Sequence, residues 1–474
     1  MSRPLPLKGS FRNAPRGLVR GGAAPILRRT ASVVTAMAAM VATSVITGPA
    51  LAEPLAASCE LERGQAHHSE GLDTWNASYT RPVHALEAVM VFLSFTDAKP
   101  ATTPAQLTAD YFPETSRFYE RASYGRFTLH PHPVGRWIQM PHASTWYAMR
   151  RDWNAARRSA YLHDAIAVSD KYVDYSRYDI VYFVADPNAP GVDSDATKVV
   201  NLDTPLRADG TDIRRVVTVF EKHPPDRLVL AHETGHTFDL PDLYHRPTGG
   251  KGDWDTYVGD WDLMGSQFGL APDMFAWHKW KLGWIDPRQV VCVRGMVTRL
   301  TLEPLEAGPT GVPQVPVSAG SSWTSATTAS AGAVGAAGSP ASPGSPDGAG
   351  AVGADPGTEA FGSGSGTKLA VVRTAPDSVI AIEARSAIGN DTGVCLQGVL
   401  VYRVRSDMES GDGPIQVLDA HPQSAACWGN SVYPPLADAP VALGESFTVP
   451  GDGVKVTVED QTPTGAWVVK ITRE

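Results

Sequence analysis

The segment 307–366 limits the possible folds of this chain more than any other part of the sequence. It consists mainly of Gly, Ala, Ser, Pro and Thr, and it contains no Lys or Arg. A segment of this composition cannot bury enough apolar surface to offset the entropy lost on folding, so we expect a flexible insertion or linker. The 474-residue chain is also longer than the range in which one hydrophobic core keeps growing. The sequence therefore predicts at least two folded units.

Short predicted strands flank this insertion. The segment 296–305 (MVTRLTLEPL) precedes it, and a series of segments in which β-branched residues alternate with polar ones follows it. These segments are LAVVR (369–373), SVIAIEAR (378–385), GVLVYRVR (398–405), SFTVPG (446–451), GVKVTVED (453–460) and AWVVKITR (466–473). We predict an all-β, sandwich-like domain over 287–474 that the insertion at 307–366 interrupts.

Residues 83–286 follow a different pattern, in which predicted strands alternate with predicted helices. The strands are EAVMVFLSF (87–95), 126–140, YDIVYFVAD (178–186), TKVVNL (197–202) and RRVVTVF (214–220), and the helices cover 107–123, 153–173 and a stretch that opens after Pro224-Pro225. Such alternation is typical of an α/β domain with a twisted, mostly parallel sheet. We therefore predict an α/β domain over 83–286.

The first 52 residues have the features of an export signal. An Arg-containing, Pro/Gly-rich stretch is followed by an uncharged stretch that ends in Ala50-Leu51-Ala52. This order predicts a secretory signal peptide (1–52) and an N-terminal segment of the mature chain at 53–82. A retained membrane anchor is the alternative, although the many Ala and Thr residues make a weak span. Arg28-Arg29 leaves a twin-arginine export route open.

One predicted helix carries the pattern H-E-x-x-H at 232–236. His232 and His236 are four residues apart, so on a helix both imidazoles project from the same face and can bind one zinc ion. Glu233 lies about 100° around the helix from His232 and can reach a water at the metal without being a ligand. This spacing predicts two metal ligands and a general base.

A catalytic zinc site needs a third protein ligand and one open position. No Glu occurs between Glu233 and Glu303, which disfavours a glutamate ligand on a second helix. Asp242 lies six residues after His236, beyond a helix end that Leu240-Pro241 predicts. We expect Asp242 to be the third ligand. Its alternative role is that of a turn residue, and His245 is the reserve ligand.

Three separated blocks carry a family resemblance: HETGHTFDLPDLYH (232–245), VGDWDLMGS (258–266) and PDMFAWHKWKLGWI (272–285). In this order they resemble the immune inhibitor A family of secreted bacterial zinc metallopeptidases, which is related to the metzincins. The similarity covers most of 83–305 and resumes after the insertion. It implies a metzincin-like catalytic domain in which His232, His236 and Asp242 bind zinc and Glu233 is the catalytic base.

The resemblance also assigns Met264 to the methionine turn beneath the metal, although a plain core methionine is the alternative. One position departs from the family pattern, because Asp239 stands where the family usually has Gly. Gly adopts the left-handed conformation that reverses the chain there. Asp tolerates this conformation better than most residues, so we expect a modest cost and a second carboxylate near the metal.

The four cysteines, Cys59, Cys292, Cys395 and Cys427, allow three disulfide connectivities. In an exported protein an even number predicts two structural disulfides. An alternative is that the thiolate of Cys59 binds the metal and so keeps the protein in a latent, inactive form. Calcium is a second possible cofactor, since a hard cation suits the clustered carboxylates of Asp253, Asp255, Asp260 and Asp262, although such runs are more often solvated loops.

The formal net charge of −9 gives no electrostatic reason to expect nucleic acid or anionic lipid as a partner. We expect protein or peptide substrates, bound as an added strand along a sheet edge that 197–202 or 214–220 supplies. We also expect a secreted monomer with no stable membrane insertion after signal cleavage. Two other functions stay open: a silent adhesion or binding protein with a relic zinc site, and a zinc hydrolase of a non-peptide amide.

Overall fold

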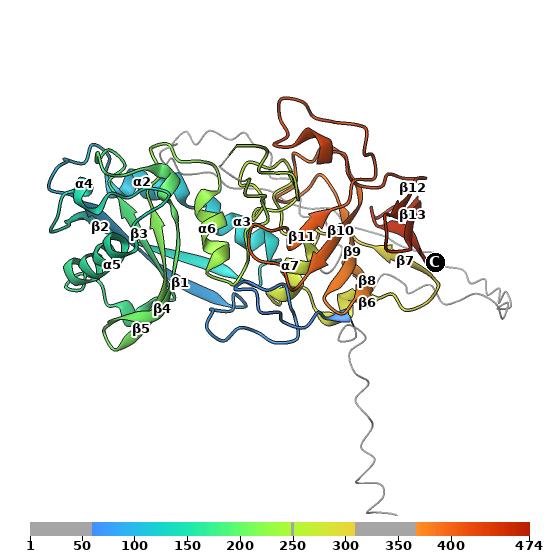
Figure 1. Cartoon of the computed structure of the whole chain (residues 1–474), viewed down its shortest axis with the longest axis horizontal. Helices are drawn as coiled ribbons and strands as arrows, with labels where there is room; N and C mark the ends of the chain where they lie inside the picture. Colours follow the sequence, from blue (N-terminus) through green and yellow to red (C-terminus); the bar gives the residue numbers. More distant parts are fainter. Residues whose placement is uncertain (1–58, 248–250, 309–365) are drawn as a thin grey trace, which may run out of the picture. The chain divides into compact units, whose positions relative to one another are not determined.

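In the computed structural model of the chain, residues 87–94 of the apolar run 87–95 lie in β1 (Ala85–Ser94), the second strand of a five-stranded sheet. The sheet has the order β2-β1-β3-β5-β4 (Figure 1). Its other strands are β2 (Thr128–Gln139), β3 (Ile180–Ala185), β4 (Lys198–Ala208) and β5 (Thr211–Val219). Every pairing is parallel except β4 with β5. The predicted mostly parallel sheet is confirmed.

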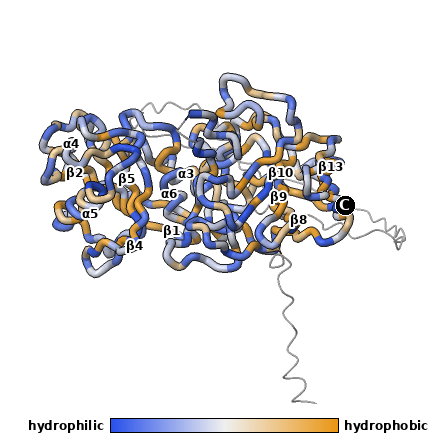
Figure 2. Tube along the Cα trace, viewed as in Figure 1, coloured by the Kyte–Doolittle hydropathy of each residue, from blue (hydrophilic) through white to orange (hydrophobic). Residues whose placement is uncertain are grey.

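Strand β1 is buried on both faces, which explains its continuous apolar character. On one face Val89, Val91 and Leu93 belong to a cluster that includes residues of α5 (Ala155–Ser169). On the other face Met90 and Phe92 belong to the largest cluster of the described residues. Figure 2 shows the corresponding hydrophobic stretches along the strands.

The predicted helix over 107–123 is two helices, α2 (Pro104–Tyr111) and α3 (Glu114–Ala122). The continuous helix was wrong because Pro113 disfavours the helical conformation for Phe112, which is extended. α2 begins with a capping box between Thr103 and Gln106. The remaining short helices of this half are α4 (Ser144–Tyr147), η2 (Tyr175–Arg177), η3 (Ser194–Ala196), α6 (Val229–His236) and α7 (Ala276–Lys281).

The second half of the described chain is β-rich, as predicted, and forms two sheets. One has the order β11-β10-β9-β8-β6 and the other the order β12-β13-β14-β7. Their strands are β6 (Val290–Cys292), β7 (Val297–Leu302), β8 (Leu369–Ala375), β9 (Ser378–Arg385), β10 (Gly398–Arg405), β11 (Ile415–Val417), β12 (Ser446–Val449), β13 (Val454–Gln461) and β14 (Trp467–Arg473), with short helices η5 (Pro287–Gln289) and η6 (Pro434–Leu436) between them.

Strand β9 is buried along its whole length, because it packs on both sides. Ile380 and Ile382 face the cluster shared with the second β-sheet. Val379 and Ala381 belong instead to the cluster that contains Trp277 of α7. The first sheet of the β-rich half therefore packs directly against the α/β half.

The structure describes residues 59–247, 251–308 and 366–474. These residues lie in one compact unit that runs from Pro54 to Glu474. The predicted signal peptide (1–52) and all but the ends of the predicted insertion (307–366) lie outside them. Among the described helices, none has the length and apolar character needed to cross a membrane.

Two disulfides are present, as the even number of cysteines predicts. Cys59 pairs with Cys292 and Cys395 pairs with Cys427. The first bond attaches the start of the described chain to β6. It also overturns the alternative in which Cys59 caps a metal, because its sulfur is bonded to Cys292.

A fully buried ionic network connects three segments that are far apart in the sequence. His278 of α7 contacts Asp262 through Nδ1 and Glu70 through Nε2, each at 3.0 Å. Burial by itself lowers the pKa of His278, but the two carboxylates raise it to about 9. Burial raises the pKa of Glu70, yet Lys281 and His278 lower it to about 2. In the folded state the imidazole of His278 therefore stays protonated and the carboxylate of Glu70 stays ionised.

The pKa of His278 predicts how stability changes with pH. Because the folded pKa lies above the ordinary value of 6.5, the stabilising contribution is complete below pH 6.5 and is lost as pH rises through about 9. We expect the unfolding free-energy difference between the wild type and His278→Gln to shrink by on the order of 3 kcal/mol over this range. Denaturant titrations from pH 6 to about 9.5 measure it, with exposed His163→Gln as the control. A constant difference would contradict the assigned network.

Candidate metal site

Helix α6 places His232 and His236 one turn apart on the same face. It lies next to α3 and to strands β4 and β5 (Figure 1). The hydroxyl of Tyr182 on β3 is 2.8 Å from the hydroxyl of Thr234, and the hydroxyl of Tyr119 on α3 donates to the carbonyl of Ala231 at 2.5 Å. These buried contacts fix the helix against the sheet, so the two imidazoles have a defined direction.

The chain reverses directly after α6, as expected. Asp239 adopts the left-handed conformation with φ 66°, and Pro241 follows two residues later. This turn brings Asp242 back to the histidines, where its Oδ1 lies 3.0 Å from His236 Nε2 and 3.4 Å from His232 Nε2. Ligand atoms of these three residues all lie within 4.8 Å of one another, and no other such group occurs in the described ranges. His245, the reserve ligand, instead contacts the hydroxyl of Tyr257 at 3.1 Å.

Both imidazoles are oriented by backbone carbonyls. His232 Nδ1 lies 2.9 Å from the carbonyl oxygen of Leu263, and His236 Nδ1 lies 2.8 Å from that of Leu240. A carbonyl accepts but does not donate, so each Nδ1 carries a proton and each Nε2 faces Asp242. An imidazole held in this way binds a metal ion through Nε2 once that nitrogen has lost its proton.

Residues of the β-rich half hold Asp242 in place through hydrogen bonds. Its backbone N–H donates to the hydroxyl of Ser410 at 2.8 Å, and the same hydroxyl donates to Asp242 Oδ2 at 3.1 Å. The backbone N–H of Gly411 donates to the carbonyl of Asp242 at 3.0 Å. The other carboxylate oxygen, Oδ1, is buried and faces the two Nε2 atoms, with no further hydrogen-bond partner among the described residues. A cation between Oδ1 and the two Nε2 atoms would satisfy it.

The charges of the group also favour a cation. Burial lowers the pKa of His236, but the carboxylates of Asp242 and Glu233 outweigh this effect and raise the pKa to about 9. Burial raises the pKa of Asp242, yet the two histidines hold it well below its usual range. The group therefore attracts positive charge, and a metal ion must compete with a proton on His236.

Met264 packs directly beneath α6. It is fully buried, and a Cβ atom added at Gly235 would lie 2.5 Å from its sulfur. A larger residue at this position would have to displace the Met264 side chain. The backbone carbonyl of Met264 accepts from the N–H of Leu243, which lies next to Asp242. Met264 therefore supports both the helix and the turn that supply the candidate ligands.

Two of the four carboxylates considered for calcium, those of Asp260 and Asp262, have other partners. Asp262 accepts from the backbone N–H groups of Met264 and Phe275, both at 2.7 Å, and contacts His278. Asp260 Oδ1 accepts from the N–H groups of Leu270 and Val432, both at 3.1 Å. These carboxylates fasten loops around the site. Calcium binding stays a prediction that the structure does not test.

A cleft runs past the group along the edge strand β4. Two cavities of about 350 and 380 Å³ form it, and both are lined by His232, Glu233 and Tyr244. Lys198, Val199 and Asn201 of β4 line the smaller cavity. The sequence left two candidate edges, and the structure puts β4 at the edge and β5 inside the sheet.

His68 and Ser410 also line the smaller cavity, and neither was predicted from the sequence. Neither belongs to a recognisable motif, and both are separated from the H-E-x-x-H pattern by more than a hundred residues. Asp239 differs from the expectation as well. Its carboxylate turns away from the candidate ligands and pairs with Arg63 at 2.7 Å and His68 at 3.0 Å.

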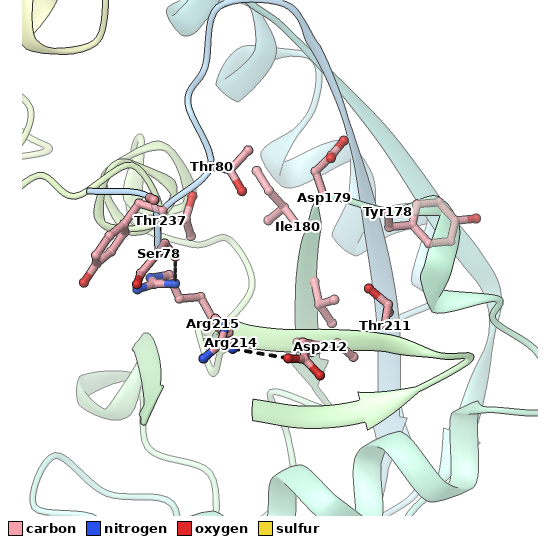
Figure 3. A pocket seen from close by; sticks show the side chains of 14 residues that line it. Ser78, Thr80, Tyr178, Asp179, Ile180, Thr211, Asp212, Arg214, Arg215 and Thr237 are labelled. Atoms are coloured by element: carbon pink, nitrogen blue, oxygen red, sulfur yellow. Dashed lines mark hydrogen bonds and ion pairs between the residues drawn. The ribbon is translucent and has the colours of Figure 1, made fainter. Parts of the chain in front are cut away.

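A separate cavity of about 360 Å³ lies at the starts of β3 and β5 (Figure 3). It is lined by Ser78 and Thr80 of the N-terminal segment and by Asp212 and Arg215 of β5, among others. It shares no lining residue with the two cavities of the cleft. None of the three candidate ligands lines this cavity.

No protein-family model matches the chain, and no curated protein is similar to it.

We predict that His236→Ala abolishes stoichiometric metal binding, because it removes one of three candidate ligands. His245→Ala is the matched control, since this imidazole lies outside the group. Metal content of both variants, measured by inductively coupled plasma mass spectrometry, tests the assignment. Undiminished metal in the His236 variant would show that the ion binds elsewhere.

Ser410→Ala should weaken metal binding by about 10- to 100-fold, the usual effect of removing a partner of a metal ligand. The substitution removes both hydrogen bonds between Ser410 and Asp242. Competition with a chelator of known affinity measures the change. Ser446→Ala, whose hydroxyl contacts exposed Thr457, is the control. Equal affinities in the two variants would exclude this role for Ser410.

Proposed function

We propose that this protein is a secreted, zinc-dependent endopeptidase. The observation that carries the proposal is the convergence of His232, His236 and Asp242, with Glu233 on the same helix and facing the same cleft. Two imidazoles and one carboxylate form a typical donor set for catalytic zinc, which keeps a fourth position open.

Zinc, when bound there, supplies a Lewis acid that polarises a carbonyl group and lowers the pKa of water. Glu233 is the general base: its carboxylate takes a proton from the attacking water and passes it to the leaving amine. Its position supports this role, since Glu233 lines both cavities beside His232 and is largely buried. His232, His236 and Asp242 would hold the ion.

The edge strand β4 favours a polypeptide substrate. β4 pairs only with β5 in the described sheet, so the backbone groups on its outer side are available to another strand. Three of its residues line the cleft beside Glu233. A peptide in extended conformation can add to this edge through its backbone, which every sequence offers. This arrangement supports cleavage within polypeptides rather than of a small amide.

The resemblance to the immune inhibitor A family agrees with this proposal. The helix that ends after His236, the reversal at Asp239 and Met264 beneath Gly235 are the features that a metzincin-like site needs. The two disulfides agree with export, because such bonds persist in oxidising compartments. We propose a monomer that acts on extracellular protein or peptide.

Glu233→Gln should keep the metal and lose about 10² to 10⁴ in kcat, as expected when a general base is removed. Hydrolysis of casein and of a mixed peptide library, with and without a chelator, measures the activity. The control is Glu120→Gln, an exposed position on α3. A Glu233→Gln variant as active as the wild type would refute the proposed base. A zinc-loaded wild type that cleaves no polypeptide would favour the binding-protein or small-amide alternatives.

A further inference from the structure

The N-terminal segment, residues 59–82, contributes a side chain to the cleft. His68 lines the same cavity as Glu233, His236 and Asp242. Its ring centroid lies 6.1 Å from that of His236, and its side chain is 7% exposed. His68 is not among the three converging ligand residues. The cleft therefore contains an imidazole with no role in metal binding or in the proposed proton transfer.

Asp239 fixes the orientation of this imidazole. His68 Nδ1 lies 3.0 Å from Asp239 Oδ1, and the other oxygen of the carboxylate pairs with Arg63 at 2.7 Å. Asp239 is fully buried and does not line the cavity. The Nδ1 side of the ring thus faces Asp239, whereas Nε2, which points in a nearly opposite direction, has no hydrogen-bond partner in the described part of the chain.

The segment that carries His68 is fastened on several sides. The ring of Tyr79 meets that of His68 edge-on at 5.5 Å, and the guanidinium of Arg215 stacks on Tyr79 at 3.4 Å. Arg215 also donates to the carbonyl of Ser78, as the dashed line in Figure 3 shows. The disulfide from Cys59 to Cys292 holds the start of the segment. His68 is therefore presented to the cleft in a fixed position.

We propose that His68 is a substrate-binding residue that accepts a hydrogen bond from a backbone N–H of the bound polypeptide, and that Asp239 is its positioning residue. The carboxylate of Asp239 accepts a hydrogen bond from Nδ1–H, which leaves the lone pair of Nε2 for a donor in the cleft. A peptide lying along β4 brings backbone N–H groups past this atom. The inference rests on the proposed peptidase function and adds a specific contact for its substrate.

This role also explains why Asp occupies a left-handed position. Glycine adopts φ 66° without strain, whereas a side chain there has a conformational cost. Asp239 gains two charged or polar partners from the N-terminal segment in return. Asp239→Gly removes the carboxylate while relieving the backbone, so it separates the anchoring role from the turn itself.

The first test compares His68→Ala, His68→Gln and Asp239→Gly with the exposed control His163→Ala. With one neutral hydrogen bond lost, kcat/KM should fall about 5- to 10-fold in His68→Ala and Asp239→Gly, mainly through KM. The Gln amide oxygen can accept, so His68→Gln should recover part of the loss. Metal content should stay at the wild-type level in all four. Loss of metal together with activity would overturn a substrate-binding role.

The second test replaces single backbone N–H groups of a peptide substrate by ester oxygens, at each position beside the cleaved bond. For the wild type, one of these depsipeptides should lose about 5- to 10-fold in kcat/KM, whereas His68→Ala should show no further loss at that position. Equal losses in both enzymes at every position would overturn the contact while leaving the peptidase intact. A zinc-loaded wild type that cleaves no peptide would instead refute the proposed function, and this inference with it.

Discussion

The carboxylate of Asp242 is the constraint on which the candidate site depends. One oxygen lies near two imidazole nitrogens, and the other accepts a hydrogen bond from the hydroxyl of Ser410. A buried carboxylate is costly unless positive charge or donors surround it, and this one has both on opposite sides. Its position requires the reversal after α6, the close packing of Met264 on Gly235 and a loop of the β-rich half. A change in any of these elements would move the third candidate ligand.

The β-rich half is therefore part of the candidate site rather than an appendage. Its first sheet packs on α7, and buried Glu383 accepts from the backbone N–H of Ala276 at 2.7 Å. The N-terminal segment is integrated in the same way through Glu70, which pairs with His278. The β-rich half and the N-terminal segment thus both contact α7.

Much of the fold could be predicted because its signals are local. Period-two alternation identified the strands of the β-rich half, and the continuous apolar run identified a strand buried on both faces. The break at Pro113 was missed because apolar spacing continued across it. The edge position of β4 was left open, since strand order depends on pairing between segments distant in the chain. Asp242 was expected from helix termination, and the structure brings it to the histidines.

By itself, the sequence determined that His232, Glu233 and His236 share one helix and that the chain turns back after them, because helix periodicity and proline act over a few residues. Only the tertiary structure decided which residues from distant parts of the sequence lie around the candidate metal ligands. His68 meets Asp239 across 171 residues and Ser410 meets Asp242 across 168. Such contacts leave no periodic pattern, because they arise from the packing of whole layers and not from the geometry of neighbouring peptide units.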